Sequence, residues 1–149
     1  MLDQTQIHDV LNEIPLFAGC PDEVLDAIAA VARERDYAKG EVIYEAGEQA
    51  LEMYVLMHGL VSFKTSTGVG HLFVETLMKR HMIFGWAALV PEHPRRLGSA
   101  TCMDASHVLA INGDRIMDIL TDHPQSGFMV MKRLCSMIAS TFIGKSHSA

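Results

Sequence analysis

Two short stretches near the middle of the chain carry residues that could hold an anion. The first reads Phe84-Gly85-Trp86-Ala87-Ala88-Leu89, and the second reads Pro94-Arg95-Arg96-Leu97-Gly98-Ser99-Ala100. A glycine followed by small residues lets the backbone approach a ligand closely, and a short helix that starts there presents free N–H groups to a phosphate. An arginine adds a permanent charge and a fixed fork of donors. The two stretches therefore predict a site for a phosphate-like group.

Strand-like runs separated by glycines surround both stretches. Gly47 and Gly59 each follow such a run, at a place where a tight turn requires a positive φ. Many short strands with regular turn signals are typical of a jelly-roll-like double sheet, so the pattern predicts a β-roll over residues 34–111. Its strands are expected at Val42–Tyr44, Met53–Met57, Leu60–Phe63, Leu72–Met78, 99–103 and 107–111.

Helical periodicity precedes the roll. Residues 4–13 and 20–32 carry apolar stripes at helical spacing, and Pro21 suits the first position of the second helix. The chain has 149 residues, which is a normal length for one domain with one core. The sequence thus predicts a single domain over residues 1–149, with its N-terminal helices within residues 4–32.

Helical periodicity returns after Asn112. A short helix is expected there, and Asp122-His123-Pro124 then breaks it. Residues 124–143 read as one long helix, for which Gly144 is a suitable C-terminal cap. Residues 112–144 are therefore predicted to form a hinge and the C-terminal helices.

This order of elements resembles the cyclic nucleotide-binding domain family over residues 12–143, a family that includes the catabolite activator protein and kinase regulatory subunits. Residues 40–47 and Gly59 are similar to the family's glycine-marked turns. Residues 84–89 and 94–100 look like its phosphate-binding cassette, which usually reads Phe-Gly-Glu-x-Ala-Leu and then Pro-Arg-x-Ala-Thr-Val. The resemblance implies a mainly β fold, a jelly-roll-like β-roll (double-stranded β-helix) with N-terminal helices and a long C-terminal helix.

The resemblance also implies a ligand-sensing regulatory domain and not an enzyme. Its ligand would be cyclic AMP, cyclic GMP or another anionic small molecule. Counting forward from Leu89 puts Arg95 in register with the family's arginine, whereas counting back from Ser99 puts Arg96 there. We favour Arg96, because a loop lengthens more easily than a strand slips in register. The residues expected around the ligand are Phe84, Gly85, Trp86, Ala87, Ala88, Leu89, Arg95, Arg96 and Ser99.

Trp86 stands where the family carries a glutamate that accepts a hydrogen bond from the ribose 2′-hydroxyl. Tryptophan offers one N–H donor and no acceptor, so discrimination for that hydroxyl should be weak. Three interpretations stay open: Trp86 stacks on a flat ligand, fills a pocket that no longer binds, or marks a surface for a protein partner. A degenerate dimerisation or docking module without a ligand is therefore the alternative function, and the retained Arg95 and Arg96 argue against it.

Other chemistries find little support in the sequence. The eight histidines are scattered and none forms the His-x-His pair of metal-binding cupins, so neither a metal site nor haem is expected. No GxSxG, Walker or dinucleotide motif occurs. Cys102 is expected to be a buried strand residue and not a nucleophile. No catalytic residue and no firm cofactor are predicted.

Charge and cysteine content limit the partners and the compartment. The net charge of −6 repels nucleic acid, so no nucleic-acid binding is expected. Three cysteines without a CxxC pair favour a reducing cytoplasm over a disulfide framework. The start of the chain lacks a signal-peptide pattern, and no apolar run approaches the 18 residues of a membrane span.

The long C-terminal helix predicts a partner. Its apolar stripe is too rich for a solvent-facing terminal helix, so a homodimer through this helix is expected; the stripe comprises Phe128, Met131, Leu134, Cys135, Ile138 and Phe142. Relatives that regulate transcription carry a helix-turn-helix after it, whereas this sequence ends at Ala149. The chain would be either the sensor fragment of such a regulator or a stand-alone module that signals through a protein partner. The start at Met1 and the polar tail mildly favour the second interpretation.

Overall fold

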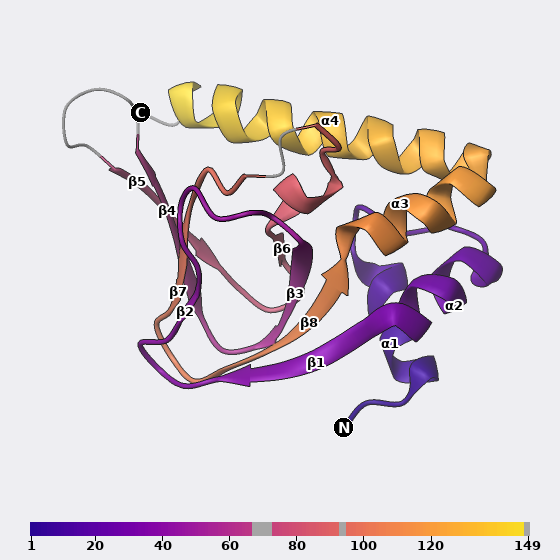
Figure 1. Ribbon diagram of the computed structural model, residues 1–149, viewed down its shortest axis with the longest axis horizontal. Coiled ribbons are helices and arrows are strands. Elements are labelled where there is room, and N and C mark those ends of the chain that lie inside the picture. The colour runs from indigo at the N-terminus through magenta and orange to yellow at the C-terminus, as the bar shows by residue number, and fades with distance from the viewer. Residues whose placement is uncertain (67–72, 93–94, 148–149) are drawn as a thin grey trace.

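The computed structural model describes residues 1–66, 73–92 and 95–147, and Figure 1 shows their arrangement. In these parts, antiparallel strands form two four-stranded sheets, with the orders β1-β8-β3-β6 and β2-β7-β4-β5. The strands are β1 (Ala32–Tyr37), β2 (Val42–Tyr44), β3 (Glu52–His58), β4 (Val61–Ser66), β5 (Phe73–Met78), β6 (Ile83–Phe84), β7 (Gly98–Cys102) and β8 (Ser106–Asn112). The helices are α1 (Gln4–Glu13), α2 (Asp22–Val31), the 3-10 turn η1 (Trp86–Leu89), α3 (Gly113–Asp122) and α4 (Pro124–His147).

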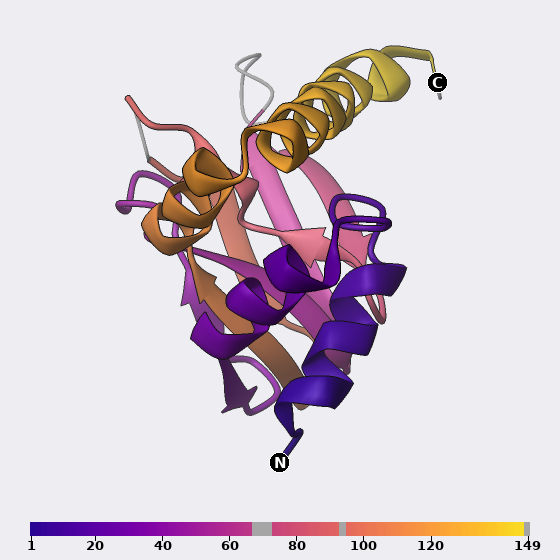
Figure 2. The same ribbon diagram turned by 90° about the vertical axis from the view of Figure 1, so that its right-hand side faces the viewer.

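Strand β3 separates the two halves of the core. Its residues 53–57 are all buried, and successive side chains of a strand point to opposite faces. Met53 and Val55 join the cluster between the first sheet and the helices, whereas Tyr54 and Leu56 join the cluster inside the roll. Figure 2 shows α1 and α2 in front of the sheet and α4 above them. The roll therefore has an aromatic interior on one side of β3 and a helix-covered aliphatic core on the other.

The predicted mainly β roll with helices at both ends is confirmed. Three details are corrected. Ala32 begins strand β1 and does not end a helix, Pro21 lies at the N-cap just before α2, and Gly144 lies inside α4 and does not cap it. The two-residue strand β6 was not expected either. Leu72 and Pro94 lie outside the described residues, and so does the side chain of Phe142.

Strand β1 has the sequence ARERDY, which shows no apolar alternation. Three of its charged side chains are instead paired with residues of β8 and β3. Arg35 donates to both carboxylate oxygens of Glu52, at 2.7 and 2.9 Å, and His107 lies against Glu34 and Asp36. These pairs replace the hydrophobic signal that normally marks a strand, which is why the sequence analysis named no strand at residues 32–37.

Among the described histidines, three have a hydrogen-bond acceptor near each ring nitrogen. Nδ1 of His107 lies 2.6 Å from Asp36, and Nε2 lies 2.8 Å from Glu34. A neutral imidazole donates only one hydrogen bond, so this geometry suits the protonated ring. Burial acts to lower the pKa of His107, but the two carboxylates outweigh it and the pKa is raised. The other two pairings are His8 with Asp26 and Asp22, and His123 with Glu23 and the carbonyl oxygen of Ile119.

Protein stability is expected to fall as pH rises from 6 to 8.5. The pKa values of His8, His107 and His123 are raised above the ordinary value of 6.5 in the folded protein. Their contribution is therefore complete below pH 6.5 and is lost as pH rises through the folded-state values. Urea unfolding at both pH values checks this, and His107→Gln should show a smaller pH dependence than the wild type. A free energy of unfolding that stays flat or rises over this range would contradict the assignment.

Within the described residues, no helix is long and apolar enough to cross a bilayer.

Candidate functional site

The candidate site begins where β6 ends. Gly85 follows Phe84 with φ of +75° and caps the start of η1. A Cβ atom at Gly85 would lie 2.9 Å from Nη1 of Arg96 and 3.0 Å from Cδ2 of Tyr54. Both the left-handed backbone and the lack of space require glycine here. The turn can therefore bring its backbone directly against the Arg96 side chain.

Arg96 is buried beneath this turn, with 5% of its surface exposed. Nη1 donates to the carbonyl oxygen of Gly85 at 3.0 Å, and Nη2 donates to that of Glu52 at 2.6 Å. Nε is buried and has no hydrogen-bond partner among the described residues. Arg96 also forms no ion pair with a carboxylate in the part of the chain that the structure describes. Within the described residues, this buried positive charge is thus compensated only by carbonyl dipoles and aromatic faces.

Aromatic rings line the inner side of Arg96. The guanidinium carbon lies 4.1 Å from the ring centroid of Tyr44 and 5.7 Å from that of Tyr54. The ring of Tyr54 stacks in turn on Tyr44, at 6.0 Å, and on Phe84, at 5.1 Å. Burial raises the pKa of both tyrosines, and nearby Arg96 lowers it only in part. Both hydroxyls therefore stay neutral at physiological pH and do not balance the charge of Arg96.

Glu52 supplies a backbone oxygen to Arg96 and not its carboxylate. Its two carboxylate oxygens accept the bidentate pair from Arg35, at 2.7 and 2.9 Å. A bidentate arginine–carboxylate pair is strong and geometrically specific. The carboxylate of Glu52 is therefore paired with Arg35 and not with Arg96.

The structure separates the two candidate arginines. Arg95 is exposed, and its Nη1 donates to the carbonyl oxygen of Gly47 at 3.1 Å. Ser99 accepts a hydrogen bond from the backbone N–H of Ala46 at 3.1 Å. Both residues thus hold the turn around residues 45–49, whereas Arg96 lies inside the roll with Phe84 and Gly85. Of the predicted residues, these last three are brought together.

Residues of η1 face the helices. Ala88 and Leu89 are buried and Ala87 is half-buried. The half-buried Trp86 side chain packs against the cluster between the first sheet and the helices. That placement puts the indole in the cluster that contains residues of α3 and α4, and it supports a structural link between the cassette and those helices.

A close backbone contact joins η1 to α3. Gly113 is the first residue of α3, and a Cβ atom there would overlap the carbonyl oxygen of Ala88 and lie 2.7 Å from its carbonyl carbon. Gly127 of α4 makes a similar contact with α3, where its Cβ would lie 2.8 Å from the carbonyl oxygen of Leu120. The turn, α3 and α4 are therefore in contact through glycines, and a movement of η1 would press on α3.

Sequence reasoning missed Tyr44, Tyr54 and Glu52. The two tyrosines appeared only as strand residues, although two aromatic side chains in neighbouring strands next to an arginine stretch were an available signal. Glu52 contributes a carbonyl oxygen, which no residue type reveals. Cys102 is buried as expected, and burial raises the pKa of its thiol, so it is a poor nucleophile.

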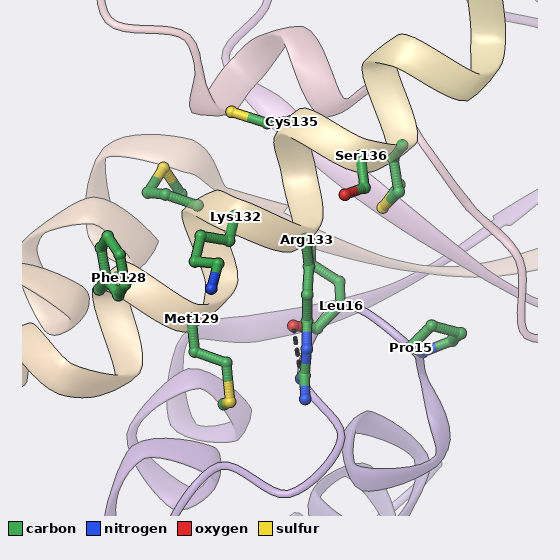
Figure 3. Close-up of a pocket in the computed structure, with 10 residues that line it drawn as sticks. Pro15, Leu16, Phe128, Met129, Lys132, Arg133, Cys135 and Ser136 are labelled. Atoms are coloured by element: carbon green, nitrogen blue, oxygen red, sulfur yellow. Dashed lines mark hydrogen bonds between the residues drawn. The ribbon is translucent and has the colours of Figure 1, made fainter.

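The apolar residues of α4 lie in two different environments. Val130 and Leu134 are buried in the helix-side cluster, whereas Phe128 is 68% exposed. Figure 3 shows an open groove between α4 and residues 15–16. Across it, Arg133 donates to the carbonyl oxygens of Leu16 at 3.3 Å and Ala18 at 2.7 Å. One face of α4 is thus fixed to the domain and another is open.

Comparison with known proteins bears on the family and the fold of the chain. Residues 34–123 match the model of the cyclic nucleotide-binding domain. The chain therefore belongs to the cyclic nucleotide-binding domain family, whose members are ligand-sensing regulatory domains.

Individual relatives are distant. The chain is 23% identical over 133 residues to the potassium channel KOR2 of Oryza sativa subsp. japonica, which covers 89% of this chain but only 18% of the channel. A putative cyclic nucleotide-binding protein from Geobacter metallireducens shares its fold with a TM-score of 0.76 at 22% identity, over 94% of this chain and 98% of that one. The regulatory domain of Toxoplasma gondii PKA, solved with cAMP, gives a TM-score of 0.77 at 19% identity. The match covers 93% of this chain and 50% of that one.

Proposed function

We propose that this domain senses a nucleotide-like anionic small molecule, which binds at Arg96 beneath the Gly85 turn. The observation that carries the proposal is the buried guanidinium. A buried charge without a partner is costly, and a protein retains one where a ligand completes it. Because Nε has no partner among the described residues and the tyrosines are neutral, we propose that a bound anion balances the charge of Arg96.

Cyclic AMP and cyclic GMP are the first ligands to consider. The family match and the cAMP present with the Toxoplasma gondii domain support them. Trp86 replaces the family's glutamate and packs toward the helices, so it provides no acceptor for a ribose hydroxyl. We therefore propose that recognition depends on the phosphate group more than on the sugar.

The proposed output is a shift in how the helices pack. Binding at Arg96 would compete with the carbonyl oxygen of Gly85, and η1 would then move against Gly113 of α3. A population shift between two packings of α3 and α4 would carry the signal to a partner, without chemical turnover. The exposed face of α4 around Phe128 is the surface that we propose to pair two copies.

A reducing, cytoplasm-like compartment is the proposed setting. Cys20 and Cys102 are buried free thiols, and Cys135 is an exposed one. An exposed free thiol is more compatible with reducing conditions than with an oxidising exterior.

Replacing Arg96 tests the binding proposal. Arg96→Ala should weaken binding at least about 30-fold, because removing one partner of a buried charge pair typically costs about 2–5 kcal/mol. Arg95→Ala is the matched control, since Arg95 is an exposed neighbour of the same type. Isothermal titration calorimetry with cyclic AMP, cyclic GMP, 2′-deoxy cyclic AMP and inorganic phosphate measures both variants.

The same titrations include the outcomes that would count against the proposal. If wild type and Arg96→Ala bound a probe equally well, Arg96 would not be part of the binding site. No heat with any of the four probes, together with unchanged thermal stability, would favour the docking module without a ligand. If cyclic AMP bound tenfold or more tightly than its 2′-deoxy form, phosphate-led recognition would be wrong while the sensor role would remain.

A further inference from the structure

We propose that Tyr44 is a positioning residue, which holds the Arg96 guanidinium against the Gly85 turn with its Nε free to meet an anion. The inference rests on the proposed role of Arg96 and names the residue that sets its geometry. Three observations carry it: the stacking distance, the irregular strand that presents Tyr44, and the arrangement of donors around the guanidinium.

Tyr44 is the closer of the two rings beneath Arg96. The guanidinium carbon lies 4.1 Å from its centroid, within the range of a direct cation–π contact, against 5.7 Å for Tyr54. Tyr44 is 4% exposed, so the contact is largely shielded from bulk solvent. Because attraction to a ring face strengthens on desolvation, this contact should be strong for its type.

The backbone of β2 is irregular at the residue that presents this ring. Strand β2 has only three residues and lies at the end of its sheet. Its pairing with β7 shifts in register between Val42, opposite Thr101, and Tyr44, opposite Ala100. Such bulges redirect a side chain, and they occur often beside functional sites. Here the shift accompanies an exposed Val42 and a buried Tyr44, which pairs with the small Ala100.

A ring against one face leaves the edges of the guanidinium to make hydrogen bonds. Two edge positions are taken, by the carbonyl oxygens of Gly85 and Glu52. Nε is buried without a partner among the described residues, although it is a strong donor. Stacking on Tyr44 fixes the plane in which Nε points, so an anion would meet a donor whose direction is already set. Preorganisation of this kind raises affinity, because less side-chain conformational entropy is lost on binding.

The alternative is that Tyr44 only fills space in the aromatic cluster. A matched set of variants separates the two roles. Tyr44→Phe keeps the ring, whereas Tyr44→Leu and Tyr44→Met remove its face and keep apolar bulk. Phe63→Leu is the control, because it removes another ring from the same cluster. The ring centroids of Phe63 and Tyr44 are 6.4 Å apart, and Phe63 is not in stacking contact with Arg96.

The first measurement needs no ligand. In the full chain labelled with ¹⁵N, the Nε–H signal of Arg96 is assigned by its loss in Arg96→Lys. Tyr44→Leu and Tyr44→Met should shift this signal by removing the ring current and should speed its hydrogen exchange tenfold or more. Tyr44→Phe and Phe63→Leu should leave both nearly unchanged. An unchanged signal and exchange rate in Tyr44→Met, which is the better tolerated variant, would overturn the proposal.

The second measurement is the titration of the same variants with cyclic AMP. Tyr44→Met should bind about tenfold or more weakly, and Tyr44→Phe should stay within about twofold of wild type. Equal weakening by Tyr44→Met and Phe63→Leu would mean that packing alone is responsible, and would overturn the positioning role. If Arg96→Ala bound like wild type, the proposed function would fail, while the Nε–H signal would still decide whether Tyr44 positions Arg96.

Discussion

Gly113→Ala is expected to lower the free energy of unfolding by about 3 kcal/mol and to disturb the link between the cassette and the hinge. Alanine is the better helix former by about 1 kcal/mol, which alone would stabilise α3. The added Cβ would, however, overlap the carbonyl oxygen of Ala88, a backbone atom that cannot turn away. Overpacking of this kind typically costs about 1–3 kcal/mol, and more where backbone must move, so the clash should outweigh the gain. Urea unfolding followed by circular dichroism measures the difference.

Gly40→Ala is the matched control for this change. Gly40 has φ of +89°, and a Cβ there would meet nothing within 4 Å. Its substitution should therefore cost only the strain of a left-handed residue, about 1 kcal/mol. If Gly113→Ala were as stable as wild type, η1 and α3 would not be in the described contact, and the proposed route from Arg96 to α4 would lose its first step.

Leu134→Ala is expected to lower the free energy of unfolding by about 2–5 kcal/mol, the usual cost of removing a buried leucine side chain. Leu134 is 4% exposed and anchors α4 in the helix-side cluster. The control lies on the same helix. Phe128 is 68% exposed, with the ammonium of Lys132 at 5.2 Å from its ring, so Phe128→Ala should change monomer stability by about 0.5 kcal/mol or less.

For self-association, Phe128→Ala should have the larger effect of the two substitutions. Sedimentation velocity at tens of micromolar should show a dimer for the wild type and a weaker one for Phe128→Ala, because the proposed pairing face includes that ring. A wild-type monomer under these conditions would contradict the dimer. A loss of stability in Phe128→Ala at low concentration, equal to that of Leu134→Ala, would instead mean that α4 docks through its other face.

Local pattern was sufficient to predict most of the fold. The apolar run of β3, the alternation in β4, and the glycines with positive φ at Gly47 and Gly59 reflect backbone geometry that neighbouring residues determine. Strand β1 was not predicted, because its stability comes from charge pairs with residues far away in the chain, such as Glu34 with His107. Periodicity reports burial, and it gives no signal where ion pairs replace burial.

The candidate site was predictable only in part, for a related reason. Register reasoning favoured Arg96 over Arg95, and the structure buries the first and exposes the second. The partners of Arg96 could not be predicted from the sequence, because strand pairing brings the carbonyl oxygen of Glu52 and the ring of Tyr44 close to it. The end of α4 was misjudged because Gly144 permits a helix to stop without requiring it.

The bonds from Arg133 also have a consequence for the order of folding. They join α4 to carbonyl oxygens 115 and 117 residues earlier in the chain. Closing so long a loop in a disordered chain costs much entropy, whereas the cost is small once the roll has brought the ends together. Attachment of α4 to the N-terminal loop should therefore be a late event on the folding pathway, and in a growing polypeptide it waits for nearly the whole domain to be synthesised.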